Sequence, residues 1–172
     1  MRNFGLLATR SVLGGYLAVH GAQKLFGAFG GHGLDATAAG FESMGLRPGK
    51  AVATLAGVSE LGGGILTVAG IADPLGPLAL SGAMAVAAAV HRKQGPLSQN
   101  GGFELPLTNL ALAIGIISTG PGKFVLGPRL PKSFARLTVL GTLTVAGLSV
   151  SQLLRAKTVT PPNAKPVSAD EE

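Results

Sequence analysis

The chain has 172 residues, of which 47% are hydrophobic and only 13% are charged, against roughly 25% charged in an average soluble domain. This composition indicates an integral membrane protein. The formal net charge of +6 would suggest nucleic acid as the partner of a soluble protein. Here the basic residues stand in short runs between apolar segments, which suits the lipid bilayer and argues against nucleic acid. The chain has no cysteine, so disulfides and thiol redox chemistry are excluded.

Five apolar segments follow one another along the chain, and a helix needs about 20 residues to cross a bilayer. They cover residues 6–26, 51–72, 75–90, 105–119 and 134–154. The third and fourth are marginal, and they span only if His91 and Glu104 at their ends lie near the membrane surface. The runs lack the period-two alternation of a barrel, and backbone hydrogen bonding in lipid then requires helices. The sequence therefore predicts an all-α, polytopic membrane helical bundle.

The first apolar segment has a second interpretation, as a cleaved signal peptide with Arg2 and Arg10 as its charged end. His20, Gln23 and Lys24 then stand where such a peptide carries small residues at its cleavage site. Because these side chains do not suit cleavage, we expect a retained helix.

The long connection 27–50 contains glycines that permit unusual backbone angles, a candidate N-cap at Asp35 and a glycine stop at Gly45. It predicts a short helix, for which two placements stay open. One is an interfacial or re-entrant helix that packs on protein or lines a polar cavity. The other is an ordinary surface helix between two spans. Beyond residue 155, the Pro-rich tail 156–172 is predicted to be disordered.

Ionisable residues from four segments converge on one half of the membrane if the helices alternate in direction. His20 and Lys24 lie near the end of the first helix, and Glu60 lies about 14 Å into the second at 1.5 Å per residue. His91 and Glu104 stand at segment ends that face the same side. We therefore expect all five to line one contiguous pocket, roofed by the connection 27–49.

Tyr16 joins this set because Tyr16, His20 and Lys24 share one helical stripe at i, i+4 and i+8. An ionised side chain near the bilayer centre costs roughly 2.5 to 3.5 kcal/mol, which favours a partner inside the bundle. Glu60 is therefore expected within salt-bridge or single-water distance of Lys24 or His20. The plainer interpretation is that Lys24 reaches the membrane surface and that any pair is only structural.

Six motifs carry a resemblance to a known family. In chain order they are HGAQKLFGAFGGHGL, FESMGLRPG, AGVSELGGGIL, VHRKQG, GGFELPL and GPGKF. Over residues 6–127 the chain resembles the DoxX family of small bacterial membrane proteins. The resemblance implies a multi-pass four-helix domain over 1–127 in the bacterial plasma membrane. It implies a relation to the small DoxD subunit of thiosulfate:quinone oxidoreductase, to oxidative-stress systems and, distantly, to membrane chaperones of receptor assembly. It gives no proven catalytic role to any residue.

Two features depart from the family pattern. Residues 128–155 add a fifth C-terminal transmembrane helix, so the two chain ends are expected on opposite sides of the membrane. The aromatic residue often found before the GGFE motif is absent, and Pro96 and Leu97 stand there instead. A stacking contact at the mouth of the pocket is therefore expected to be missing.

The leading hypothesis is an accessory subunit of a membrane-associated oxidoreductase that binds a quinone-like or other small redox molecule. The chain has no flavin or nicotinamide fingerprint, so we expect no intrinsic cofactor and a membrane or peripheral redox partner. His20 and Lys24 would hydrogen-bond a carbonyl, Glu60 and Glu104 would move protons, and His91 would titrate near neutral pH. Whether the protein is itself an enzyme stays open.

Three alternatives to this hypothesis are haem ligation, a zinc site and a scaffold without catalytic activity. Haem ligation by His20 and His91 is disfavoured by their different depths and by adjacent Lys24 and Arg92, and no compact ligand spacing predicts zinc. A non-catalytic scaffold or assembly factor remains open. The glycines at 14–15 and 62–64 suit close packing within the chain or in a homo-oligomer. Basic residues at the N-terminal side, Arg10 among them, favour a cytoplasmic N-terminus.

Overall fold

The computed structural model describes residues 1–155, which form six α-helices and three short 3-10 turns without a β-strand. In chain order these elements are α1 (Arg2–Phe26), η1 (Ala28–Gly30), α2 (Gly33–Ser43), α3 (Gly49–Ala69), α4 (Leu75–His91), η2 (Arg92–Gln94), η3 (Ser98–Asn100), α5 (Glu104–Thr119) and α6 (Lys132–Arg155). The prediction of an all-α helical bundle is confirmed. The predicted disordered tail lies outside the described residues.

Three of the described helices are long and apolar enough to cross a membrane: α3, α4 with the turn that follows it, and α6. Helix α5 is apolar but has 16 residues, so the predicted fourth segment is short. Helix α1 has 25 residues but is not among these three. Arg10, His20, Gln23 and Lys24 lower its hydropathy. The chain is a membrane protein, and its long helix α1, which carries Tyr16, His20 and Lys24 of the predicted site, does not qualify as a fourth span by the same measure.

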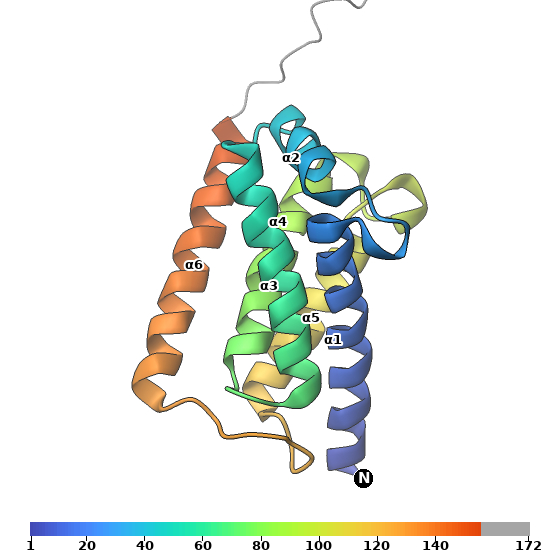
Figure 1. The fold of residues 1–172 in the computed structure, drawn as a ribbon. Coiled ribbons are helices and arrows are strands. Elements are labelled where there is room, and N and C mark those ends of the chain that lie inside the picture. Colours follow the sequence, from blue (N-terminus) through green and yellow to red (C-terminus); the bar gives the residue numbers. More distant parts are fainter. Residues whose placement is uncertain (156–172) are drawn as a thin grey trace, which may run out of the picture.

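The helices form an up-and-down bundle, with α1, α3, α4 and α5 side by side and α6 on the outside (Figure 1). Helix α3 packs against α1 and α4, while α4 packs against α5 and α6. The short helix α2 lies at the end of the bundle where α1 ends and α3 begins (Figure 1). A buried cluster joins α1, α4 and α5, and its members are Leu13, Leu17, Leu80, Met84, Ala113 and Ile116. Helix α6 contributes no buried residue.

Glycines allow α1 and α3 to approach closely. A Cβ on Gly14 would lie 2.6 Å from the carbonyl oxygen of Gly64, and a Cβ on Gly64 would lie 2.4 Å from that of Gly14. A Cβ on Gly21 would lie 2.3 Å from a backbone nitrogen of α3. The close packing predicted for these glycines therefore occurs within the chain. Gly15 and Gly62, by contrast, have no atom within 4 Å of such a Cβ.

The predicted helix in the 27–50 connection is present as α2, but its N-cap is His32 and not Asp35. Asp35 lies in the first turn of α2, where its carboxylate accepts a hydrogen bond from Lys50 at 3.0 Å. The glycine stop is observed, since Gly45 follows the helix with a φ of 89°, which favours glycine.

Arg10, one of the basic residues on the N-terminal side, is buried within the protein with 1% exposure. Its guanidinium donates to the carbonyl oxygens of Pro121 at 2.7 Å and Val68 at 3.3 Å, and also to that of Phe124. These bonds explain how a charge is tolerated there, since a buried ion needs dense hydrogen bonding. Arg10 thereby fastens the connection between α5 and α6 to α1 and α3.

Candidate functional site

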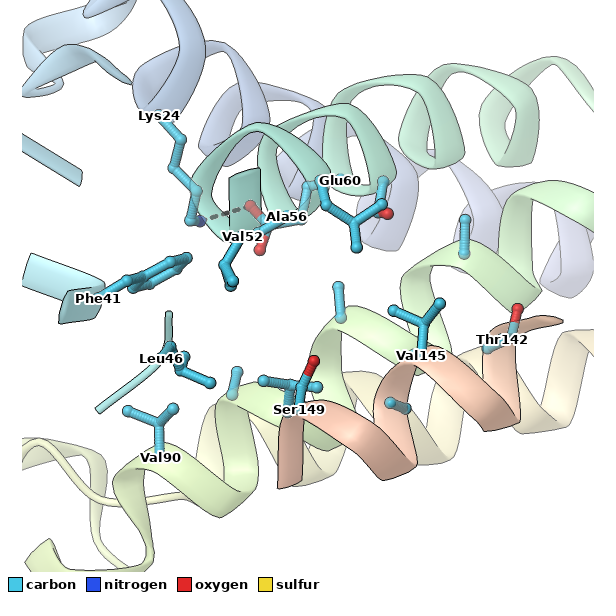
Figure 2. A pocket seen from close by; sticks show the side chains of 18 of the residues that line it. Lys24, Phe41, Leu46, Val52, Ala56, Glu60, Val90, Thr142, Val145 and Ser149 are labelled. Atoms are coloured by element: carbon cyan, nitrogen blue, oxygen red, sulfur yellow. Dashed lines mark hydrogen bonds and ion pairs between the residues drawn. The ribbon is translucent and has the colours of Figure 1, made fainter. Parts of the chain in front are cut away.

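A cavity of about 360 Å³ lies between α3, α4 and α6, beneath α2, and is called here the main cavity. Figure 2 shows apolar side chains from all four elements facing one another across it. Most of its wall is alanine, valine and leucine. Its polar lining residues are Lys24, Ser59, Glu60, His91, Thr142 and Ser149. The site is therefore a mainly apolar space with a few polar groups.

Lys24 and Glu60 form an ion pair on one wall of the main cavity, in which the Lys24 ammonium donates to Oε2 of Glu60 (Figure 2). Glu60 is 4% exposed, and the Lys24 side chain is 25% exposed. One turn before Glu60, Gly57 packs directly on the side chain of Leu25, which brings the last turn of α1 next to α3. The predicted contact between Glu60 and Lys24 is confirmed.

The roof of the main cavity comes from α2 and the segment after it, as predicted. Phe41, Met44 and Leu46 line the cavity, and Leu46 is fully buried. The backbone N–H of Gly49 donates to the Glu42 carboxylate at 3.0 Å, which joins the end of α2 to the start of α3. Of the two placements considered for this helix, the structure shows one that packs on protein and covers a cavity.

Helix α6 provides a wall of the main cavity that the sequence analysis did not identify. Its lining residues are Gly141, Thr142, Val145, Ala146 and Ser149. The helix lies close to α4 at Gly82, where a Cβ would be 2.8 Å from the methyl group of Thr142. Its far end is held by Gln152, whose amide donates to the carbonyl oxygen of Arg47 at 3.1 Å. The small and hydroxyl side chains at helical spacing along α6 are the sequence feature that could have predicted this wall.

His91 lines the main cavity at the end of α4. Its Nδ1 lies 2.7 Å from the carbonyl oxygen of Gly101. Because a carbonyl only accepts, Nδ1 carries a proton, and Nε2 is the nitrogen left for another partner. The contact fixes the ring against the loop that leads into α5.

Tyr16, His20 and Glu104 do not line the main cavity, so the prediction of one pocket holding all the candidates is wrong for them. Tyr16 is 70% exposed, because α1 turns Leu13 and Leu17 toward the bundle and Tyr16 away from it. The Glu104 carboxylate accepts the backbone N–H of Ser98 at 2.9 Å, which closes the loop before α5. The residues brought together are Lys24, Glu60 and His91.

His20 lines a separate recess of about 310 Å³, called here the histidine hollow, where α1 meets the start of α2. Its lining residues are His20, Gln23, Lys24, Gly30, Gly31, His32 and Thr37. Lys24 also lines the main cavity. The two recesses are therefore neighbours that share one side chain.

A chain of hydrogen bonds orients His20. The Gln23 amide N–H donates to the carbonyl oxygen of Phe29 at 3.3 Å, so the amide oxygen of Gln23 faces His20 Nδ1 at 3.0 Å and accepts a hydrogen bond from its N–H. Phe29 has a φ of 52°, an uncommon value for a residue other than glycine. A Cβ on Gly31 would lie 2.5 Å from Gln23 Cα. The glycine-rich turn is thus fitted to the last turn of α1.

A second polar cluster lies at the opposite end of the bundle, around the α3–α4 connection. Asp73 is buried there, and its Oδ2 lies 4.0 Å from Arg129 Nε. Burial raises the pKa of Asp73, while the charges of Arg129 and Arg10 act in the opposite direction. This cluster holds the α5–α6 connection against the bundle, at the end opposite Lys24 and α2 (Figure 1).

The geometry also bears on metals and haem. His20 and His91 line different recesses, so the structure does not bring them together as two axial ligands. Across residues 1–155, no group of three or more His, Asp or Glu side chains is arranged to hold a metal ion.

Comparison with known proteins gives one match. The DoxX family model matches residues 5–92, just over half of the chain, from α1 to the end of α4. The match includes Lys24, Glu60 and His91 and excludes α5 and α6. No curated protein and no solved structure matches the chain.

Proposed function

This chain belongs to the DoxX family, and from that premise we propose that the main cavity binds a lipid-soluble molecule with an apolar body and a carbonyl head, such as a quinone. The observation that carries the proposal is the buried Lys24–Glu60 pair on one wall of an otherwise mainly apolar cavity. A ligand site of this kind typically combines apolar walls with a few placed polar groups. The bound quinone would supply the redox chemistry for a partner protein.

The ion pair favours a neutral head group. Lys24 and Glu60 neutralise each other, so a charged ligand would leave an unbalanced charge in a poorly solvated space. The Lys24 ammonium has three N–H donors, and its bond to Glu60 uses one of them. A remaining N–H can donate to a carbonyl oxygen, and the second carboxylate oxygen of Glu60 can accept from a hydroxyl.

The size and surroundings of the main cavity agree with such a ligand. Its volume of about 360 Å³ is at the lower end of the range typical of small-molecule sites, roughly 300 to 1,000 Å³. The wall formed by α6 has no buried residue, so the cavity is separated from the surrounding lipid by a single helix. A ring system without a long tail fits this space best.

The proposal is tested by titrating the purified protein with menadione, a tailless naphthoquinone. Ala56 lines the main cavity one turn before Glu60, and Ala56→Phe should fill the space and weaken binding about tenfold, a change of about 1.4 kcal/mol. Ala111→Phe is the matched control, because Ala111 is an exposed alanine on α5 that does not line the cavity. Equal affinity for menadione in wild type and Ala56→Phe would overturn the proposal.

His20 provides a second check on the location. Because His20 lines the histidine hollow and not the main cavity, His20→Gln should leave the affinity for menadione unchanged. A loss as large as that of Ala56→Phe would show that the binding site is elsewhere.

A further inference from the structure

The histidine hollow has a lining rich in hydrogen-bond donors. His20, Gln23, Lys24, His32 and Thr37 provide its polar side chains, and no carboxylate lines it among the described residues. The main cavity differs in this respect, because Glu60 is part of its wall. A recess with amine, imidazole and amide groups and no acid of its own suits an anion.

Several N–H groups of the hollow are not used in hydrogen bonds within the described part of the protein. Lys24 gives one N–H to Glu60 and keeps two, and the Gln23 amide gives one N–H to Phe29 and keeps one. His20 Nδ1 is held by Gln23, so the position of the ring is already set. The anion would meet groups whose positions are already set, which lowers the entropic cost of binding.

The position of the hollow points to a lipid as the source of the anion. Phe26 and Phe29, at the end of α1 and in the adjoining turn, are both highly exposed. Below them on α1, Val12, Tyr16 and Val19 also face outward. In a membrane protein, exposed aromatic and aliphatic side chains beside a polar recess match an amphiphile, with its head in the recess and its chain along the helix.

We propose that the histidine hollow binds the phosphate group of an anionic phospholipid, with an acyl chain lying along the exposed face of α1. The phosphate is held by Lys24, His20 and His32, and Gln23 orients His20 toward it. Basic recesses between helices near a membrane surface are suited to such head groups. This site lies beside the proposed quinone site and shares Lys24 with it, but its two histidines do not line the main cavity, so it can be tested independently of that proposal.

The experiment measures lipid retention by the full chain in native mass spectrometry. The purified protein is offered phosphatidylglycerol or phosphatidylcholine with identical acyl chains, each with and without excess inorganic phosphate. The test variant is His20→Gln/His32→Gln, which leaves the Lys24–Glu60 pair in place. The matched control is Lys123→Gln/Lys132→Gln, because these two exposed lysines lie in the α5–α6 connection and at the start of α6, at the other end of the bundle. Circular dichroism confirms that each variant is folded.

Wild type should retain phosphatidylglycerol about fivefold more than phosphatidylcholine, as expected when a few partly exposed charge-assisted contacts are made. The double histidine variant should lose this preference, the lysine control should keep it, and inorganic phosphate should not displace the lipid. The proposal is overturned by equal retention of the two lipids, by a preference that survives in the histidine variant, or by an equal loss in the control. Displacement by inorganic phosphate would identify a free anion as the ligand and overturn the lipid.

Discussion

Removing one partner of the Lys24–Glu60 pair should destabilise the protein. The loss of unfolding free energy should differ between the two single substitutions. Glu60 is 4% exposed, so Lys24→Met leaves a carboxylate buried without a partner, at a cost of about 3 kcal/mol. The Lys24 side chain is 25% exposed and can turn toward the histidine hollow. Glu60→Gln should therefore cost only about 1 kcal/mol, because the remaining ammonium reaches a more polar setting.

The assay is the free energy of unfolding in mixed detergent micelles, measured for wild type, both single variants and the double variant Lys24→Met/Glu60→Gln. The double variant removes both charges, so it should be more stable than Lys24→Met alone, with a coupling energy of about 1.5 kcal/mol or more. Equal losses in the two single variants would refute the asymmetry inferred from burial. Additive losses in the double variant would refute the pair itself.

Three other changes test the helix packing and the second polar cluster around Asp73. Gly21→Ala should destabilise by about 1 to 3 kcal/mol by forcing α1 from α3, whereas Gly15→Ala, with no atom within 4 Å, should be neutral or stabilise by up to about 1 kcal/mol in the same unfolding assay. Arg10→Met should cost about 3 kcal/mol and speed proteolysis of the α5–α6 connection, and exposed Arg2→Met should do neither. Burial raises the pKa of Asp73 from 3.8, so its neutral form stabilises the fold at low pH, and this stability is lost as pH rises through the raised pKa. Asp73→Asn should therefore reduce the fall in Tm that wild type shows as pH rises above 3.8, and an unchanged dependence of Tm on pH would contradict the assignment.

The Lys24–Glu60 pair could be predicted because the sequence allows few other partners for either charge. Both residues interrupt apolar segments, and alternation of helix direction places them in the same half of the membrane. A carboxylate buried in the membrane without a cation nearby is energetically unfavourable. The roof formed by α2 was predictable for a similar reason, since irregular backbone near a bilayer needs protein to pack on.

Tyr16 and His20 show where helical periodicity stops being informative. The spacing of Tyr16, His20 and Lys24 establishes that they share a stripe, but not that the stripe faces inward. The orientation of α1 is set by Leu13 and Leu17, which pack into the buried cluster, and by the glycines against α3. Lys24 reaches Glu60 because its side chain is long, whereas the shorter His20 stays outside.

Arg10 and Glu104 could not be placed because their partners are backbone groups. Arg10 donates to carbonyl oxygens of Pro121 and Phe124, more than a hundred residues away, and every residue type presents such an oxygen. Glu104 accepts from the Ser98 backbone within a loop whose conformation the sequence does not determine by spacing. Side-chain chemistry alone carries no signal for contacts of this kind.

The main cavity is lined by two parts of the chain, one inside the stretch that matches the family and one beyond it. Its ionisable residues Lys24, Glu60 and His91 lie within the stretch that matches the family, which ends at residue 92. The wall from α6 lies beyond that stretch, and the space exists because residues such as Gly141 and Ala146 are small. A leucine at either position would project into the cavity and reduce its volume. Family members that share the matched part but differ in the helix beyond it are therefore expected to keep the Lys24–Glu60 contact and to have a cavity of a different size.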